Sequence, residues 1–180
     1  LMDKFVFESK KGTYFDEENR RHILNIRNAY AEAAGNLADA GRKEEANKLL
    51  EKCVSMIHVE DMPYGMVSRR NNHNINGLVF LEAAYKAGNL KLANEVKTAI
   101  QKDLQQQDQY SKYLQAEKEE FYSYFDGQGG EADRNRQLLS MINALEQRYN
   151  PTAAQKQQQQ PQQELPGQTI QTAPKDSQAK

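Results

Sequence analysis

Side chains that could recognise a partner gather in one stretch of this sequence, between residues 58 and 76. An aromatic ring and two methionines come first, followed by two arginines, several asparagines and a histidine. Aromatic rings and guanidinium groups are enriched where protein surfaces bind their partners, so this loop suits contact with a peptide or a glycan. The predicted binding residues are Tyr64, Arg69, Arg70, Asn72 and His73.

A second interpretation of the same loop is structural. Met62, Pro63 and Tyr64 precede Gly65 and Met66, and apolar side chains in a long loop also serve to fasten it over a junction between helices. In that case Tyr64 and Met66 are buried. A loop of this length is uncommon without a functional or a structural reason.

Catalytic and metal-binding patterns are not found in the sequence. The three histidines (His22, His58 and His73) form no HExxH motif, and there is no GxSxG motif. Cys53 is the single cysteine, which excludes an internal disulfide, and it follows Leu49 and Leu50 on an apolar face. We therefore expect no catalytic residue, no cofactor, no metal ligand and a buried thiol.

Charge and hydropathy limit the partners. The first 150 residues carry 21 basic and 23 acidic side chains, whereas a nucleic-acid-binding surface normally needs a basic excess. The sequence contains no run of 18 apolar residues, which is about the length that a helix needs to span a bilayer. We expect neither nucleic-acid binding nor direct membrane insertion by this chain.

Composition divides the chain into two parts. Residues 151–180 hold ten of the glutamines and four of the five prolines, and such a segment cannot bury enough apolar surface to fold. We predict a disordered tail over 151–180 and a helical-repeat domain over 1–150, with an extended arm at 1–15. The chain begins with leucine, so it is expected to be a segment of a longer protein.

A motif that occurs twice predicts the architecture. Residues 40–49 (AGRKEEANKL) are echoed by residues 87–96 (AGNLKLANEV). A glycine that ends one helix, followed by an alanine near the start of the next, is typical of helical repeats of the tetratricopeptide kind. Gly41 and Gly88 are 47 residues apart, whereas that repeat has about 34 residues, and the long loop accounts for the difference.

Apolar residues at spacings of three and four predict an all-α fold. Asp16 is the expected N-cap of the first helix, and a break near Asp108 is an alternative within the fourth. The predicted helices span about 17–40, 43–57, 75–87, 89–114 and 131–149. About five to six helices would form tetratricopeptide-like hairpins, with a binding face lined by the first helix of each hairpin and the last helix covering the second hairpin.

Several short motifs, taken in their order, resemble a known family. They look like the soluble C-terminal region of a family of bacterial multi-spanning membrane proteins of unknown function, whose membrane domain is similar to protein O-mannosyltransferases. The motifs that carry the resemblance are Met2-Asp3-Lys4-Phe5, residues 12–21 (GTYFDEENRR), residues 40–46 (AGRKEEA), Met62-Pro63-Tyr64 and Tyr85-Lys86-Ala87-Gly88. The resemblance covers residues 1–150 and excludes the tail.

The resemblance implies a location and a context. The chain would be a soluble, periplasmic domain of an inner-membrane protein, beside a membrane part that resembles glycosyltransferases using lipid-linked sugars. The catalytic carboxylates of such enzymes lie in the membrane part, so none is assigned to this sequence.

Three functions follow as hypotheses. The first is a non-catalytic interaction or scaffold domain that docks a protein or a glycan acceptor for the attached membrane domain. The second is a purely structural or dimerisation role for the parent protein. The third, a free-standing enzyme, would require a pocket with converging titratable groups.

Overall fold

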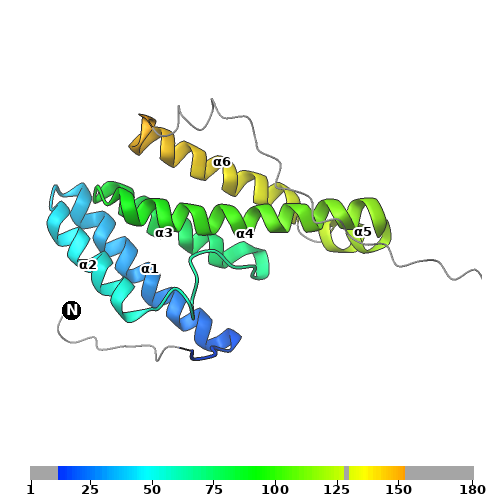
Figure 1. Ribbon diagram of the computed structural model, residues 1–180, viewed down its shortest axis with the longest axis horizontal. Coiled ribbons are helices and arrows are strands. Elements are labelled where there is room, and N and C mark those ends of the chain that lie inside the picture. The colour runs from blue at the N-terminus through cyan, green and yellow to red at the C-terminus, as the bar shows by residue number, and fades with distance from the viewer. Residues whose placement is uncertain (1–11, 128–129, 153–180) are drawn as a thin grey trace, which may run out of the picture.

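The computed structural model describes residues 12–127 and 130–152, and all regular secondary structure in these ranges is helical (Figure 1). The predicted arm is therefore described only from Gly12, and the predicted tail only as far as residue 152. The helices are α1 (Glu17–Asp39), α2 (Lys43–Met56), the short 3₁₀ helix η1 (Arg69–Asn71), α3 (Asn72–Lys86), α4 (Leu90–Glu117), α5 (Glu119–Gly127) and α6 (Glu131–Tyr149).

The duplicated motif forms two similar turns, between α1 and α2 and between α3 and α4. Gly41 and Gly88 have φ angles of +79° and +76°, which a residue with a side chain rarely adopts. In both turns the amide after the glycine donates to the carbonyl five residues earlier, at 2.9 Å. This bonding satisfies carbonyls that the helix end leaves open, so each glycine ends its helix and starts a hairpin.

The two hairpins pack through their first helices. α1 contacts both α2 and α3, and α3 in turn contacts α4. α6 packs on α3 and α4, on the side of the second hairpin away from the first (Figure 1). The prediction that the last helix covers the second hairpin is therefore confirmed. Fully buried side chains from these helices include Leu50, Phe80, Leu81, Val96, Ile100, Leu104 and Ile142.

The loop between the hairpins is anchored to the core. Met62 and Tyr64 are buried, and the Tyr64 ring stacks on Phe80 with a centroid separation of 5.6 Å. Gly65 lies against α4 so closely that a Cβ atom there would be 2.5 Å from the carbonyl oxygen of Ala99. Only glycine allows this approach of two backbones.

One boundary of the predicted helices was wrong, because α3 begins at Asn72, three residues earlier than expected. The predicted fourth helix is confirmed as one continuous element, since α4 runs through Asp108 as far as Glu117. The apolar pattern of the fourth helix includes Leu90, but this residue is 48% exposed at the first position of α4. The start of α3 and the last turns of α4 lie against the rest of the domain, since Asn71, Ser111 and Leu114 are all buried.

Polar side chains contribute to the interior as well. Five of them form a hydrogen-bonded network between η1, α3, α4 and α6, in which Asn71 donates to Asn135 and to Gln107, and Asn74 donates to Asp103 at 2.7 Å. A buried amide must have partners, since leaving one unpaired costs about 1–3 kcal/mol. The network therefore holds the start of α3 and the position of α6 together.

Candidate functional site

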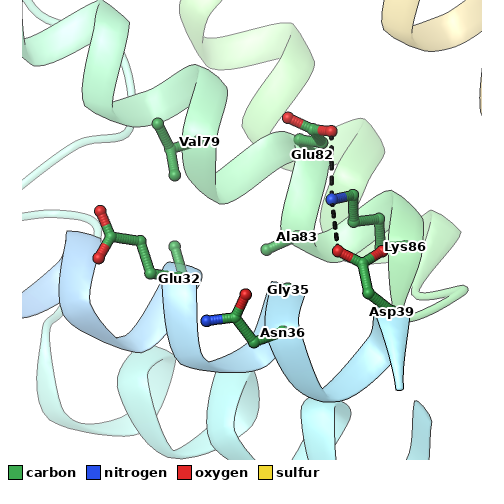
Figure 2. A pocket seen from close by; sticks show the side chains of 9 residues that line it. Glu32, Gly35, Asn36, Asp39, Val79, Glu82, Ala83 and Lys86 are labelled. Carbon is green, nitrogen blue, oxygen red and sulfur yellow. Dashed lines mark hydrogen bonds and ion pairs between the residues drawn. The ribbon is translucent and has the colours of Figure 1, made fainter. Parts of the chain in front are cut away.

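A groove of about 330 Å³ lies between α1 and α3 (Figure 2). It lies between the first helices of the two hairpins, where the repeat pattern predicts a binding face. The lining residues are Ala31, Glu32, Gly35, Asn36 and Asp39 from α1, and Val79, Glu82, Ala83 and Lys86 from α3.

Small residues keep the floor of this groove open. Gly35 lies inside α1 and is faced by Ala83 from α3 (Figure 2), and Ala31 is a further small residue of the lining. A Cβ atom built on Gly35 would meet nothing within 4 Å. A glycine inside a helix costs about 0.5–1 kcal/mol relative to alanine, and packing between the helices does not require it here. The free space above Gly35 is thus available to a ligand.

Acidic groups dominate the rim of the groove. Lys86 Nζ lies 2.9 Å from Asp39 Oδ2 and 3.5 Å from Glu82 Oε1, so it bridges α1 and α3 at one end (Figure 2). The hydrogen bond to Asp39 is the main cause of a raised pKa for the Lys86 ammonium group, which therefore stays charged at neutral pH.

Glu32 carries the remaining carboxylate, at the other end of the groove (Figure 2). Its Oε1 atom accepts a hydrogen bond of 2.7 Å from the amide of Asn28. Among the residues that the structure describes, no cationic side chain forms an ion pair with Glu32. An exposed carboxylate without a counter-charge is free to bind a cationic or hydrogen-bond-donating group.

The binding residues predicted in the loop separate into two groups. Arg69, Arg70 and Asn72 are exposed. Tyr64 and His73 are 3% and 1% exposed, so neither side chain is available to a partner on this surface. The structure therefore brings Tyr64 and His73 together in the interior and leaves the other three outside.

Contacts made by Arg27 and His73 hold Tyr64 and the surrounding loop in place. Its guanidinium group donates to the carbonyl oxygens of Met62 at 2.6 Å and Pro63 at 3.0 Å, and it lies 4.9 Å from the centroid of the Tyr64 ring. His73 Nε2 contacts the same Pro63 oxygen at 2.6 Å. These contacts fasten the loop to α1, and Tyr64 is buried as the structural interpretation of the loop predicts.

Burial shifts the titration of these groups. Desolvation raises the pKa of Tyr64 to about 12 and lowers the pKa of His73. Burial also lowers the pKa of Arg27 from its ordinary value. Each shift favours the neutral form, as expected for a group withdrawn from water, so His73 is neutral near pH 7.

A second groove, of about 670 Å³, lies between the start of α1 and the residues that lead into α3. Arg69 and Asn72 line it, together with Arg20, whose Nη1 atom lies 3.8 Å from Met66 Sδ. This groove is lined by both cations and carboxylates. Some of them already pair with each other, as Arg21 does with Glu18 at 2.7 Å. This balance of charge gives the groove no clear preference for one kind of ligand.

Cys53 and the acidic side chains do not form a reactive centre in the described part of the chain. Burial raises the pKa of the Cys53 thiol to about 11, which disfavours the nucleophilic thiolate. Within residues 12–127 and 130–152 there is no group of three or more His, Cys, Asp or Glu side chains placed to hold a metal ion.

The sequence pattern predicted the face between α1 and α3 but none of its individual residues. The signal that could have found them is Gly35, an isolated glycine inside a strongly helical pattern. A glycine inside a helix costs stability relative to alanine, and no neighbour in the structure requires it here, since a Cβ atom on Gly35 would meet nothing within 4 Å.

Comparison with known proteins adds no family or function. No family model, no curated protein and no solved structure matches this chain. None of the described helices has the length and apolar character that crossing a bilayer requires.

Proposed function

We propose that this chain is a tetratricopeptide-like docking module that binds a segment of another protein in the groove between α1 and α3. The observation that carries the proposal is Gly35, which keeps the floor of the groove open at a cost in helix stability that no packing contact explains. Repeat folds commonly use the face formed by successive repeats for binding.

The polar rim supports a polypeptide as the ligand. Asn36, Glu32 and Glu82 offer amide and carboxylate groups along the two walls, and such groups can bond the amides of an extended segment. The groove is short and open, so it suits a few residues of a chain better than an enclosed small molecule.

The family resemblance supplies the proposed context. The module would be a periplasmic, non-catalytic domain beside a glycosyltransferase-like membrane domain, where it would dock a protein acceptor or an assembly partner. The resemblance of residues 1–150 to the soluble region of those membrane proteins is the support for this part of the proposal.

Selection from a random dodecapeptide library displayed on phage, with the full chain as bait, tests the docking function. Binding of selected peptides should then be compared between the parent chain, Gly35→Leu and Ala33→Leu. Ala33 is exposed on the same helix and lies outside the groove lining, so it is the matched control.

Gly35→Leu should weaken binding at least tenfold because the new side chain fills the groove, whereas Ala33→Leu should bind like the parent. Circular dichroism verifies that both variants are folded. The proposal is wrong if no peptide is enriched, or if Gly35→Leu binds as well as the parent. Burial of the groove in a stable homodimer, detected by sedimentation, would instead favour the dimerisation role.

A further inference from the structure

We infer that the segment bound between α1 and α3 is cationic, with a lysine or arginine side chain that pairs with Glu32. This inference rests on the proposed docking function and names the chemistry of its ligand. The groove lining contains three carboxylates and one ammonium group, so its charge at neutral pH is complementary to a basic segment and repels an acidic one.

The chain itself shows how an ammonium group fits this rim. Lys86 Nζ lies between Asp39 of α1 and Glu82 of α3, at 2.9 and 3.5 Å. The Lys86 ammonium group already occupies the position between these two carboxylates, although it offsets only one of their two charges. A cation from a ligand is therefore directed to the opposite end, where Glu32 has no ion-pair partner among the described residues.

The spacing along α1 defines the geometry of the ligand. Glu32 and Gly35 are three residues apart and lie on one face of the helix. A bound backbone can pass over Gly35, where a Cβ atom would have met empty space, while its basic side chain reaches Glu32. Glu32 and Asp39 are separated by about 10 Å along the helix axis, the span of about three extended residues.

Hydrogen bonding at Glu32 supports the same assignment. Asn28 Nδ2 donates to Oε1 at 2.7 Å, which orients the carboxylate and leaves acceptor positions on it for a ligand. Arginine can bond a carboxylate through two parallel N–H groups, whereas lysine binds it as a point charge. We expect an arginine-bearing segment to bind more tightly than its lysine counterpart.

Fluorescence anisotropy with four synthetic nonapeptides tests the inference on the full chain at low salt. The peptides share a Gly/Ser background and carry two arginines, two lysines, two acetyl-lysines or two glutamates, three residues apart. The arginine and lysine peptides should bind, and the acetyl-lysine and glutamate peptides should bind at least fivefold more weakly. Two charge-changing variants, Glu32→Gln and Glu32→Lys, should then be measured against Glu117→Gln and Glu117→Lys.

Glu117 is exposed at the end of α4 and lies outside the groove, so its variants change the net charge of the protein equally. Glu32→Gln should weaken binding of the arginine peptide about fivefold, the size expected for an exposed ion pair. Glu32→Lys should weaken it at least tenfold, and the Glu117 variants less than twofold. Equal effects at Glu32 and Glu117 would mean non-specific attraction and would overturn the inference.

Two further outcomes separate this inference from the docking function. Peptides that bind equally well with arginine and acetyl-lysine, and whose binding is lost in Gly35→Leu, would overturn the cationic preference while leaving the docking groove in place. Binding that is unchanged in both Gly35→Leu and Glu32→Lys would overturn both proposals.

Discussion

Lys97 Nζ lies 2.6 Å from Glu146 Oε1 in the interior of the domain, with the two side chains 4% and 3% exposed. Lys97 belongs to α4 and Glu146 to α6, so this ion pair links the last helix to the second hairpin. A charge removed from water is tolerated only when it is paired and hydrogen-bonded. The pair therefore makes the seating of α6 depend on an electrostatic contact as well as on apolar packing.

Breaking this pair should destabilise the protein strongly. Lys97→Met removes the ammonium group that lies 2.6 Å from the buried Glu146 carboxylate, and the expected loss is about 3–5 kcal/mol in the free energy of unfolding. The double variant Lys97→Met/Glu146→Leu should recover most of that loss. Urea denaturation of both variants measures the effect. Arg42→Gln, which breaks the exposed Arg42–Glu45 pair, is the control and should leave the urea midpoint almost unchanged.

Replacing either of two helical glycines by alanine should change the free energy of unfolding, in opposite directions for the two sites. Gly35→Ala should raise the free energy of unfolding by about 0.5–1 kcal/mol, because its Cβ atom enters free space. Gly77→Ala should lower it by about 1–3 kcal/mol, because a Cβ atom there would lie 2.8 Å from the Tyr64 carbonyl oxygen and from Ile100 Cδ1. Thermal unfolding of both variants checks this, and a loss of stability in Gly35→Ala would contradict the account of the groove floor.

The loop residues predicted to bind should differ sharply in their effect on stability. Tyr64→Ala removes a buried ring that stacks on Phe80 and should cost about 3–5 kcal/mol. The double variant Arg69→Ala/Arg70→Ala changes only exposed side chains and should stay within about 0.5–1 kcal/mol of the parent. Denaturation midpoints distinguish the two, and a costly arginine variant would show that these side chains have a structural role.

His73 should make the domain less stable in mild acid. Its pKa is lowered by burial in the folded state, so the unfolded chain binds more protons once the pH falls below the unfolded value of about 6.5. The contribution is fully present above that pH and decreases as the pH falls toward the folded pKa. Free energies of unfolding between pH 5 and 8 measure the slope.

His73→Gln should reduce that slope, since glutamine does not titrate and retains a donor for the Pro63 carbonyl. An unchanged slope in His73→Gln would assign the acid sensitivity to other groups.

The Cys53 thiol should react slowly while the domain is folded. Its pKa is raised by burial from 9.0 to about 11, so at pH 8 the thiolate fraction falls roughly 100-fold, and burial adds a steric barrier. Labelling with Ellman's reagent should therefore be slow in buffer and rapid in urea above the unfolding midpoint. Rapid labelling in buffer would mean that α2 opens locally without global unfolding.

Local pattern was sufficient for most of the helices and for most of their ends. The periodic apolar residues predicted α1, α2 and α6 closely, and Gly41 and Gly88 end their helices as expected because only a residue without a side chain favours their positive φ angles. Asp16 caps α1 as predicted, its carboxylate accepting from the Asn19 amide at 2.8 Å. These features depend on residues within one helical turn, which a sequence displays directly.

The start of α3 depended on distant partners. Asn71 bonds to Gln107 and Asn135, which are 36 and 64 residues away, and these contacts bury a segment that its polar composition presents as a loop. Polar side chains such as Asn74 carry no sequence signal of burial, because the same residues are common on surfaces.

The sequence by itself determined that the chain is helical and where its two hairpins turn. Only the tertiary structure decided that Tyr64 and His73 are interior residues, that Arg27 and Lys97 are buried charges, and that Gly35 opens onto a groove with Glu32 at its end. The physical reason is the distance along the chain over which each kind of interaction acts. Helix periodicity and caps are interactions over three to five residues, whereas burial and charge pairing join side chains tens of residues apart, and no local pattern specifies which of many polar side chains will meet.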